Sequence, residues 1–163
     1  MGGICGIVRH DTPAPALVPR LRRMQHRLKH RGPDGEGKYF GSHVALAHTR
    51  LALLDRDGGA QPMSSLDGRY TIVYNGEVYD VDALRAQIGD RWTFRTRSDV
   101  EVVLAAFVAW GKECLDRLNG MFAFFVWDEK EGRGFGARDR LGVRPFVYRH
   151  AEGEFAFASE AKA

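Results

Sequence analysis

Residues 121–127 read Met-Phe-Ala-Phe-Phe-Val-Trp, and this nearly unbroken apolar and aromatic run decides the fold class. The run is far too short to span a membrane. A short apolar run with aromatic and β-branched residues is typical of a β-strand that is buried on both faces. We therefore expect a layered protein in which this strand lies inside a sheet that is covered on both sides.

Further strands are expected on both sides of this run. They are short stretches of aromatic, β-branched and aliphatic residues that lie between turn signals. Their expected ranges are 4–8, 44–48, 51–54, 70–74, 134–138, 146–149 and 155–159. Asn75-Gly76 follows one of these strands and is a strong turn signal, so we expect that strand to end there.

Helices are expected mainly in the first two thirds of the chain. An apolar stripe with helical spacing runs from Leu17 to Leu28, and residues 30–35, which contain Gly32, Pro33 and Gly35, are expected to stop this helix and form a loop. A second helix is predicted over 81–88, with Asp80 as its cap. Ser98-Asp99-Val100-Glu101 has the capping-box pattern and predicts a third helix that ends near Gly111. Together these signals predict one α+β domain over residues 1–163, with antiparallel sheets covered by helices.

Composition and charge narrow the function classes. The chain has 163 residues, 44% hydrophobic and 28% charged, and a net charge of +3, values typical of a soluble globular domain, and its first residues are expected to be too few and too polar for a secretory signal. The two cysteines provide no disulfide framework, which favours the cytoplasm. A basic cluster between Arg20 and Arg31 has no interleaved aromatic residues, so we expect no nucleic-acid partner. His26 and His30 lack a third ligand, so we expect no metal.

A few polar residues, taken together, indicate recognition of an amino acid. The guanidinium of Arg50 could bind an α-carboxylate through two hydrogen bonds. The carboxylate of Asp99 could bind an α-ammonium group. The side chain of Asn75 and the backbone N–H of Gly76 could form an oxyanion hole. Each of these residues alone has an ordinary structural explanation, but the set is what hydrolysis of the glutamine side-chain amide requires.

The order of several short motifs makes a family resemblance specific. They extend over nearly the whole chain and are His30-Arg31-Gly32-Pro33-Asp34, Arg50 to Asp55, Gly59-Ala60-Gln61-Pro62, Asn75-Gly76-Glu77-Val78-Tyr79, Ser98-Asp99-Val100-Glu101, Gly120-Met121-Phe122-Ala123-Phe124, Arg138-Asp139-Arg140-Leu141-Gly142 and Ala158-Ser159-Glu160. In these motifs the chain resembles the glutaminase domain, a class II glutamine amidotransferase, of glutamine-hydrolysing asparagine synthetases. The resemblance implies the four-layer αββα sandwich of N-terminal-nucleophile hydrolases.

The resemblance also implies roles for individual residues. Arg50 would hold the carboxylate of glutamine and Asp99 its ammonium group, while Asn75 and Gly76 would form the oxyanion hole. Glu77 would lie beside the substrate. The pocket would be lined by the segment that follows Arg50, namely Leu51, Ala52, Leu53 and Leu54. The sequence departs from the family at Arg97, where a glycine is usual, and at Val100, where threonine is frequent.

The first residues depart from the family pattern in the part that carries the chemistry. The family opens with Met-Cys-Gly-Ile-x-Gly, and the cysteine becomes the N-terminal nucleophile whose own α-amine accepts the proton. Here the chain begins Met1-Gly2-Gly3-Ile4-Cys5-Gly6. In one register Gly2 occupies the cysteine position. In the other, Cys5 is the nucleophile after removal of four residues, and Arg9 falls where glycine belongs. We favour the first register, in which no thiol is present.

Two hypotheses about function follow from this start. In the first, the chain is the domain that hydrolyses glutamine to glutamate and ammonia for a synthetase domain, with its nucleophile replaced or located at Cys5. In the second, it is a non-catalytic glutamine-binding or structural cap domain of an ATP-dependent amide-forming synthetase. The expected ligand is L-glutamine or L-glutamate, and the expected partner is the synthetase domain, with a homodimer as one option for assembly. No cofactor is expected in this domain; ATP and magnesium would belong to the synthetase domain.

Overall fold

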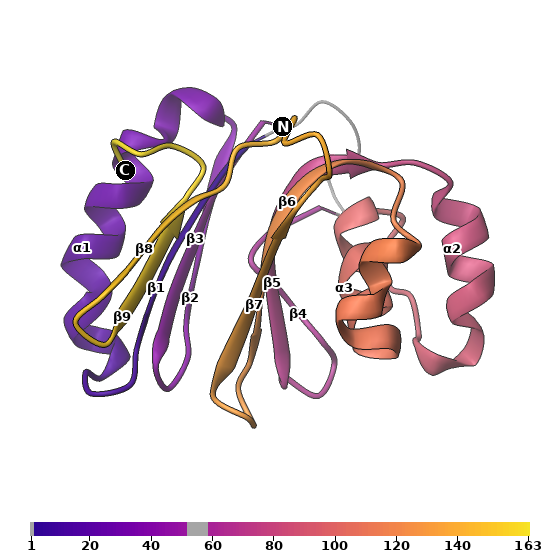
Figure 1. Ribbon diagram of the computed structural model, residues 1–163, viewed down its shortest axis with the longest axis horizontal. Coiled ribbons are helices and arrows are strands. Elements are labelled where there is room, and N and C mark those ends of the chain that lie inside the picture. The colour runs from indigo at the N-terminus through magenta and orange to yellow at the C-terminus, as the bar shows by residue number, and fades with distance from the viewer. Residues whose placement is uncertain (1, 52–58) are drawn as a thin grey trace.

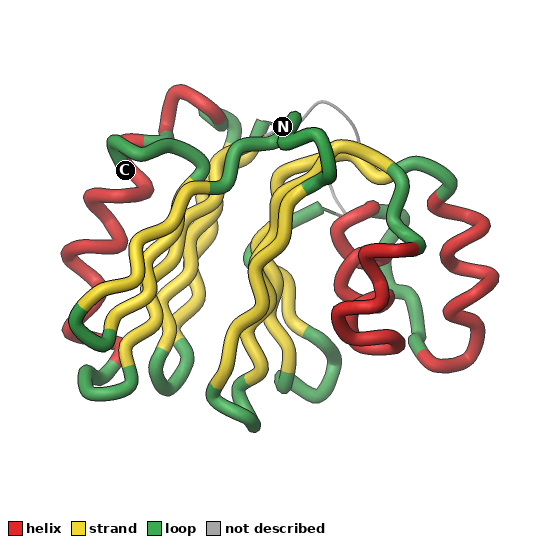
Figure 2. The backbone as a smooth tube through the Cα atoms, in the orientation of Figure 1, coloured by secondary structure: helices red, strands yellow, loops and turns green. Residues whose placement is uncertain are grey.

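The computed structural model describes residues 2–51 and 59–163. Two antiparallel sheets lie face to face in the middle of the molecule, and helices cover the outer face of each sheet (Figure 1). Figure 2 shows the strands of the two sheets as two distinct layers between the helices. The α+β class and the four-layer αββα sandwich are therefore confirmed.

The first sheet, sheet A, contains both ends of the chain. Its strand order is β2-β3-β1-β9-β8. Its elements are β1 (Gly2–Arg9), β2 (Gly35–Phe40), β3 (Val44–Arg50), β8 (Val147–Ala151) and β9 (Glu154–Ala158), and helix α1 (Ala14–Arg27) covers its outer face. The first strand is central in this sheet because it pairs with β3 on one side and with β9 on the other. The N-terminal residues are thus held between partners from distant parts of the sequence.

The second sheet, sheet B, is formed by the middle of the chain. Its strand order is β4-β5-β6-β7. Its elements are β4 (Met63–Ser64), β5 (Tyr70–Val78), β6 (Gly120–Asp128) and β7 (Arg133–Arg138), and helices α2 (Val81–Ile88) and α3 (Asp99–Trp110) cover its outer face. Short 3₁₀ helices lie at Lys29–Arg31, Gly89–Arg91 and Gly111–Asp116. None of the helices formed by the described residues is long and apolar enough to cross a membrane.

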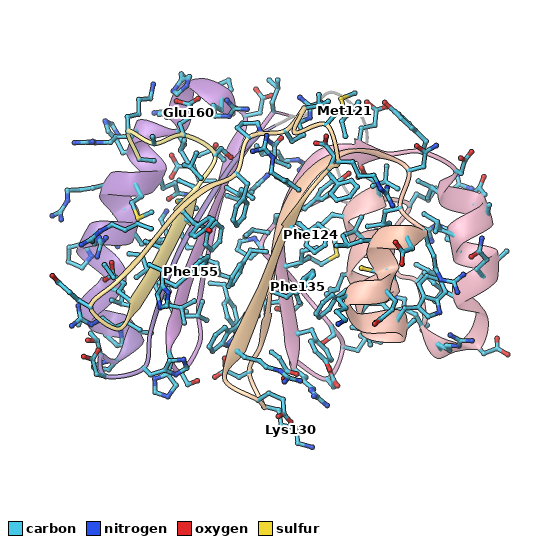
Figure 3. All side chains as sticks on the ribbon, in the orientation of Figure 1. Met121, Phe124, Lys130, Phe135, Phe155 and Glu160 are labelled. Atoms are coloured by element: carbon cyan, nitrogen blue, oxygen red, sulfur yellow. The ribbon has the colours of Figure 1, made fainter. Side chains whose placement is uncertain are left out.

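Apolar side chains fill the three spaces between the four layers (Figure 3). Strand β6 illustrates the arrangement, because Phe124 packs toward the helices whereas Phe125 and Trp127 pack between the sheets. All three side chains are at most 2% exposed, so β6 is buried on both faces as its composition predicts. Burial of each side chain of this size stabilises the fold by about 1.5–3 kcal/mol. The aromatic run thus holds two of the three apolar layers together.

The backbone differs from expectation at two places. Residues 35–40 form strand β2, for which no strand was predicted, because they pair with β3 along its length. Strand β5 does not end at Asn75-Gly76 but continues to Val78, and it pairs with β6 throughout. An ideal Cβ at Gly76 would lie 2.5 Å from the carbonyl oxygen of Met121, so glycine here permits a close approach of two strands rather than a turn.

The helix boundaries agree with the sequence, but the expected capping contacts do not form. Helix α2 spans the predicted residues, yet Asp80 has a left-handed backbone with φ 56° and makes no side-chain cap. Ser98 precedes α3 without a side-chain cap. The carboxylate of Glu101 accepts hydrogen bonds from the backbone N–H groups of Arg95 and Thr96, at 2.9 and 2.7 Å, instead of from Ser98. The capping-box residues therefore fix the segment before the helix rather than its first turn.

Candidate functional site

The alternation of side chains along strands brings several predicted residues to one end of the space between the sheets. On β1, Ile4 and Val8 face sheet B, so Gly2 belongs to the same face. On β3, Val44 and Leu46 face sheet B, which places His48 and Arg50 on that face as well. On β5, Val73 faces sheet A, as Asn75 then does. The N-terminus lies at this end of the sandwich (Figure 1).

The backbone of Gly2 is held from both sheets. Its N–H donates to Oδ1 of Asn75 at 3.1 Å, and its carbonyl oxygen accepts from Nε of Arg31 at 3.2 Å. The Arg31 guanidinium also donates to Glu160 at 2.9 Å, and the next strand residue, Ile4, donates its N–H to Oγ of Ser159 at 3.0 Å. These contacts hold the motifs around Arg31 and Ser159-Glu160 beside the N-terminal strand, although both motifs lie far from that strand in the sequence.

Little space surrounds the Cα atom of Gly2. An ideal Cβ there would lie 2.1 Å from the carbonyl oxygen of Thr49 and 2.9 Å from Nε2 of His48. A contact of 2.1 Å with a backbone atom is far inside the van der Waals limit, so any side chain at this position requires the end of β1 or β3 to move. The backbone around residue 2 is therefore packed closely enough that only a glycine fits without movement.

Asn75 links the two sheets through a hydrogen bond, and only one of its two side-chain polar atoms takes part in it. Its Oδ1 accepts from Gly2, and the residue is 1% exposed. Its Nδ2 is buried and has no hydrogen-bond partner among the described residues. A buried amide N–H₂ without a partner is costly in a folded protein, commonly about 1–3 kcal/mol. This donor is available to an oxygen atom of a ligand beside Gly2.

His48 is a cavity residue that sequence reasoning missed. It is 5% exposed, and burial lowers its pKa to about 3, with smaller contributions from the N-terminal charge and Arg50. The imidazole is therefore neutral at pH 7. The signal that could have found His48 is the alternation in β3, since His48 lies two residues before Arg50 and so on the same face.

Asp99 is the first residue of α3, where the helix dipole favours a carboxylate. Its Oδ2 accepts hydrogen bonds from the hydroxyl of Tyr74 at 2.6 Å and from the backbone N–H of Val78 at 3.3 Å. The carboxylate is thus attached to strand β5, which also carries Asn75 and Gly76. Residues from the end of β5 and the start of α3 therefore form one connected wall.

These residues line a single cavity of about 740 Å³, a volume within the range of small-molecule sites. Of the residues predicted for the site, the cavity wall includes Gly2, Arg50, Leu51, Asn75, Gly76, Glu77 and Asp99. It also includes His48, Gln61 and Tyr74, which sequence reasoning did not select. Ala52, Leu53 and Leu54, predicted to line the pocket, lie outside the described residues.

Cys5 lies on the other face of β1. It packs with residues of α1 in the apolar layer outside sheet A, and it is completely buried. Its backbone pairs with Ala47 on one side and Ala158 on the other. Burial raises the pKa of its thiol to about 12, so it is protonated at neutral pH. The thiol of Cys5 and the Cα of Gly2 are thus on opposite faces of one strand.

The titratable residues do not suggest a metal centre. Within residues 2–51 and 59–163, no group of three or more His, Cys, Asp or Glu side chains is arranged to hold an ion. His30 instead contacts the carboxylate of Glu160, with 2.9 Å between Nε2 and Oε1. The cavity residues have the chemistry to bind polar and charged organic groups.

Comparison with known proteins agrees with this geometry. Residues 1–163 match the glutamine amidotransferase domain family. The chain is 43% identical to asparagine synthetase [glutamine-hydrolyzing] 3 of Bacillus subtilis and 40% identical to asparagine synthetase B [glutamine-hydrolyzing] of Escherichia coli. Each alignment covers 100% of this chain but only 27% and 30% of the respective relative, so the chain spans less than a third of their length.

A solved structure supports the fold independently of close sequence similarity. The glutamine phosphoribosylpyrophosphate amidotransferase of B. subtilis superposes with a TM-score of 0.76 at 22% identity. The superposition covers 98% of this chain and 42% of that protein. At this level of identity the likeness concerns the fold. With the family match over its whole length and relatives above 30% identity, the chain belongs to the glutamine amidotransferase domain family of the asparagine synthetase type.

Proposed function

We propose that this domain binds L-glutamine or L-glutamate in the cavity beside Gly2 and, as the sequence stands, does not form a thioester. One observation carries the proposal: Gly2, Arg50, Asn75-Gly76 and Asp99 line the same cavity although they are distributed over almost a hundred residues of sequence. A cation, an anion and an amide donor are the groups needed to bind an α-amino acid with a side-chain amide.

In the proposed complex, Arg50 binds the α-carboxylate and Asp99 binds the α-ammonium group. The side-chain oxygen of the ligand lies near Gly2, where it accepts hydrogen bonds from Nδ2 of Asn75 and the N–H of Gly76. The buried Nδ2, which has no hydrogen-bond partner among the described residues, supports this orientation. Glu77 and Leu51, which also line the cavity, lie beside the ligand.

Hydrolysis would require a nucleophile at residue 2. In the family chemistry a thiol at this position attacks the amide carbon, the amide leaves as ammonia, and water then hydrolyses the thioester to glutamate. Gly2 supplies no thiol. The placement of Cys5 supports the register with Gly2 at the nucleophile position, since the Cys5 thiol faces α1 and is fully buried. Cleavage before Cys5 would also remove the strand residues that bond to Asn75 and Ser159.

The relatives suggest the context in which such a domain works. Their names describe glutamine-hydrolysing synthetases, and more than two thirds of their length lies outside the matched region. We propose a synthetase domain as the partner, with ATP and magnesium required only there and no cofactor required in the cavity of this domain. The second candidate, a non-catalytic ligand-binding cap on such a synthetase, is favoured by the close packing around Gly2. We propose the cytoplasm as the location.

Titration calorimetry with L-glutamine and L-glutamate tests the binding proposal. We expect binding at millimolar or lower concentration, and we expect Arg50→Ala to weaken it by about thirtyfold or more, because removal of a charged hydrogen-bond partner typically costs about 2–5 kcal/mol. The matched control is Arg97→Gly, which removes an exposed arginine that also lines the cavity and should change affinity by less than about fivefold. Absence of binding by the unmodified chain, or equal effects of the two variants, would contradict the proposal.

A further inference from the structure

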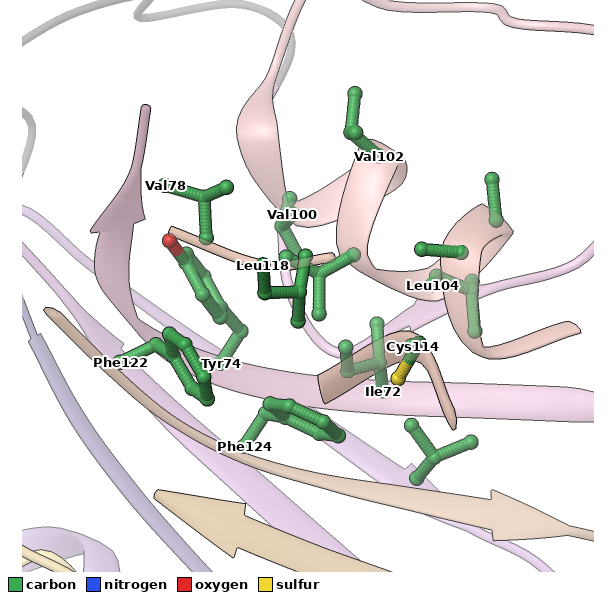
Figure 4. Close-up of a cluster of buried hydrophobic side chains, with 14 of the residues drawn as sticks. Ile72, Tyr74, Val78, Val100, Val102, Leu104, Cys114, Leu118, Phe122 and Phe124 are labelled. Carbon is green, nitrogen blue, oxygen red and sulfur yellow. The ribbon is translucent and has the colours of Figure 1, made fainter. Parts of the chain in front are cut away.

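Tyr74 is an unusual member of the apolar layer between sheet B and its helices. Its ring packs with Phe122, Phe124 and Leu118, and the side chain is only 3% exposed (Figure 4). A phenylalanine would fill such a place without carrying a polar atom into it. The hydroxyl lies at the end of the ring that Figure 4 shows near Val78, at the edge of this layer. The polar atom therefore needs a specific partner.

That partner is the carboxylate of Asp99. The Tyr74 hydroxyl donates to Oδ2 at 2.6 Å, a short distance typical of a hydrogen bond to a charged acceptor. The N–H of Val78 donates to the same oxygen at 3.3 Å. Within the described part of the chain, the hydrogen bonds from the Tyr74 hydroxyl and the Val78 N–H to the Asp99 carboxylate both use Oδ2. The other oxygen, Oδ1, is thereby left to accept a hydrogen bond from a molecule in the cavity.

Tyr74 is itself rigidly placed. Its backbone N–H donates to Oε1 of Gln61 at 2.6 Å, beyond the short stretch in which β4 pairs with β5. Its ring is enclosed by the apolar layer. Burial, followed by the charge of Asp99, raises the pKa of Tyr74 well above its usual value, so the hydroxyl keeps its proton and remains a donor at neutral and moderately basic pH. A fixed donor of this kind holds one orientation of the acceptor.

We propose that Tyr74 is a positioning residue for amino-acid recognition: its hydroxyl orients the Asp99 carboxylate toward the α-ammonium group of the ligand. This inference rests on the proposed function, since it requires an α-amino acid in the cavity. Tyr74 makes no proposed contact with the reacting amide of the ligand. Its effect on affinity must therefore depend on whether the ligand has an α-ammonium group, whereas a general packing role would affect all ligands of the cavity alike.

The test compares Tyr74→Phe with the unmodified chain. The ligands are L-glutamine and its analogue without the α-amino group, 5-amino-5-oxopentanoic acid, and their affinities are measured by calorimetry or ligand-observed NMR. We expect glutamine affinity to fall about tenfold or more, because a hydrogen bond to a charged group is worth about 1.5–3 kcal/mol and 1.4 kcal/mol corresponds to tenfold. The affinity of Tyr74→Phe for the analogue should differ from that of the unmodified chain by less than about twofold.

The matched control is Tyr70→Phe, which removes a hydroxyl from the other end of the same strand and the same apolar layer. It should leave both affinities unchanged. In an Asp99→Asn background, Tyr74→Phe should have little further effect on glutamine, since the two residues act as one unit. Circular dichroism and thermal unfolding verify that each variant is folded.

The outcomes separate the two proposals. If the unmodified chain binds neither glutamine nor glutamate, the proposed function fails and the role of Tyr74 fails with it. If the unmodified chain binds glutamine and Tyr74→Phe binds it equally well, only the role of Tyr74 is refuted. An equal loss of affinity for glutamine and for the analogue without the amino group would show a structural role and also refute the positioning role.

Discussion

The two sheets contribute to the cavity in different ways. Sheet A brings Gly2 and Arg50 there on the ends of β1 and β3, where the backbone is packed so closely that residue 2 has no room for a side chain. Sheet B and the helix α3 that covers it contribute side chains whose polar atoms are organised by hydrogen bonds, as Tyr74 on β5 and Asp99 on α3 show. Sheet B also contributes an amide, that of Asn75, with a buried donor that the described chain does not use.

This difference separates two tasks, namely binding an amino acid and breaking its amide bond. The groups proposed to hold an amino acid are present and come from both sheets. The position proposed to break the amide bond, at the end of β1, carries no side chain. Binding and bond breaking can therefore be tested independently, and each of the following predictions changes one side of the comparison.

The largest expected effect is on glutamine hydrolysis at residue 2. The chain as it stands should release no ammonia above background, because loss of a covalent nucleophile can reduce turnover about a millionfold. Gly2→Cys, in protein from which Met1 has been removed, should restore hydrolysis and accept a covalent label from diazo-oxo-norleucine. Ammonia release and intact-protein mass spectrometry measure these outcomes.

Gly2→Ala is the matched control for this experiment, because it adds a Cβ without a thiol. Both substitutions should lower the free energy of unfolding by about 1–3 kcal/mol, as is typical of overpacking, since the Thr49 carbonyl lies 2.1 Å from the ideal Cβ position. A folded Gly2→Cys protein that binds glutamine but forms neither ammonia nor an adduct would show that the thiol cannot reach its working position.

The opposite face of β1 should respond differently. Cys5→Ala should lower the free energy of unfolding by about 1 kcal/mol, through loss of packing against α1, while glutamine affinity stays the same. Because the buried thiol has a pKa of about 12, native protein at pH 8 should resist alkylation at Cys5. Urea unfolding and mass spectrometry provide the measurements. A diazo-oxo-norleucine adduct at Cys5 would instead favour the register in which this residue is the nucleophile.

A smaller effect is expected at Glu160, which binds Arg31 beside the Gly2 carbonyl. The hydrogen bond from Arg31 is the main reason that the pKa of Glu160 falls from 4.5 to about 2. A carboxylate with a depressed pKa stabilises the fold fully above its unfolded pKa and loses that contribution as the pH falls toward its folded pKa. Glu160→Gln should therefore cost up to about 1 kcal/mol at pH 7, and the cost should vanish between about pH 4.5 and pH 2.

Urea unfolding of the two proteins across this pH range tests the prediction. Asp90→Asn, at an exposed carboxylate next to α2, is the control and should show no comparable pH dependence. If the difference between Glu160→Gln and the unmodified chain were the same at pH 7 and pH 2, the ion pair would not be what holds the start of β1.

Several features could be predicted from the sequence because their causes are local or compositional. Helix α2 covers the predicted residues, since an apolar helical pattern and Gly89 define its length. The strand at 121–127 has two buried faces because nearly every residue in it is apolar or aromatic. Recognition of the family depended on motifs that can be compared along the chain without knowing which of them meet in space.

Other features were decided by the pairing of strands. Asn75-Gly76 remains extended because β6, far along the chain, supplies its hydrogen bonds, and residues 35–40 become a strand because the neighbouring β3 does. At Asn75-Gly76 the pairing reverses a local turn preference, since strand pairing satisfies more backbone groups than an isolated turn. Turn statistics cannot include a partner strand that is about fifty residues away.

The sequence by itself determined the fold class, the family and the set of charged and amide groups proposed to bind an amino acid. Only the tertiary structure decided which of these groups meet, that Gly2 and Cys5 occupy opposite faces of one strand, and that His48 and Tyr74 belong to the cavity. The physical reason is that residue identity sets which bonds a side chain can make. Sheet pairing, which joins β1 to β3 and β5 to β6, sets where the side chain lies and which partners it has.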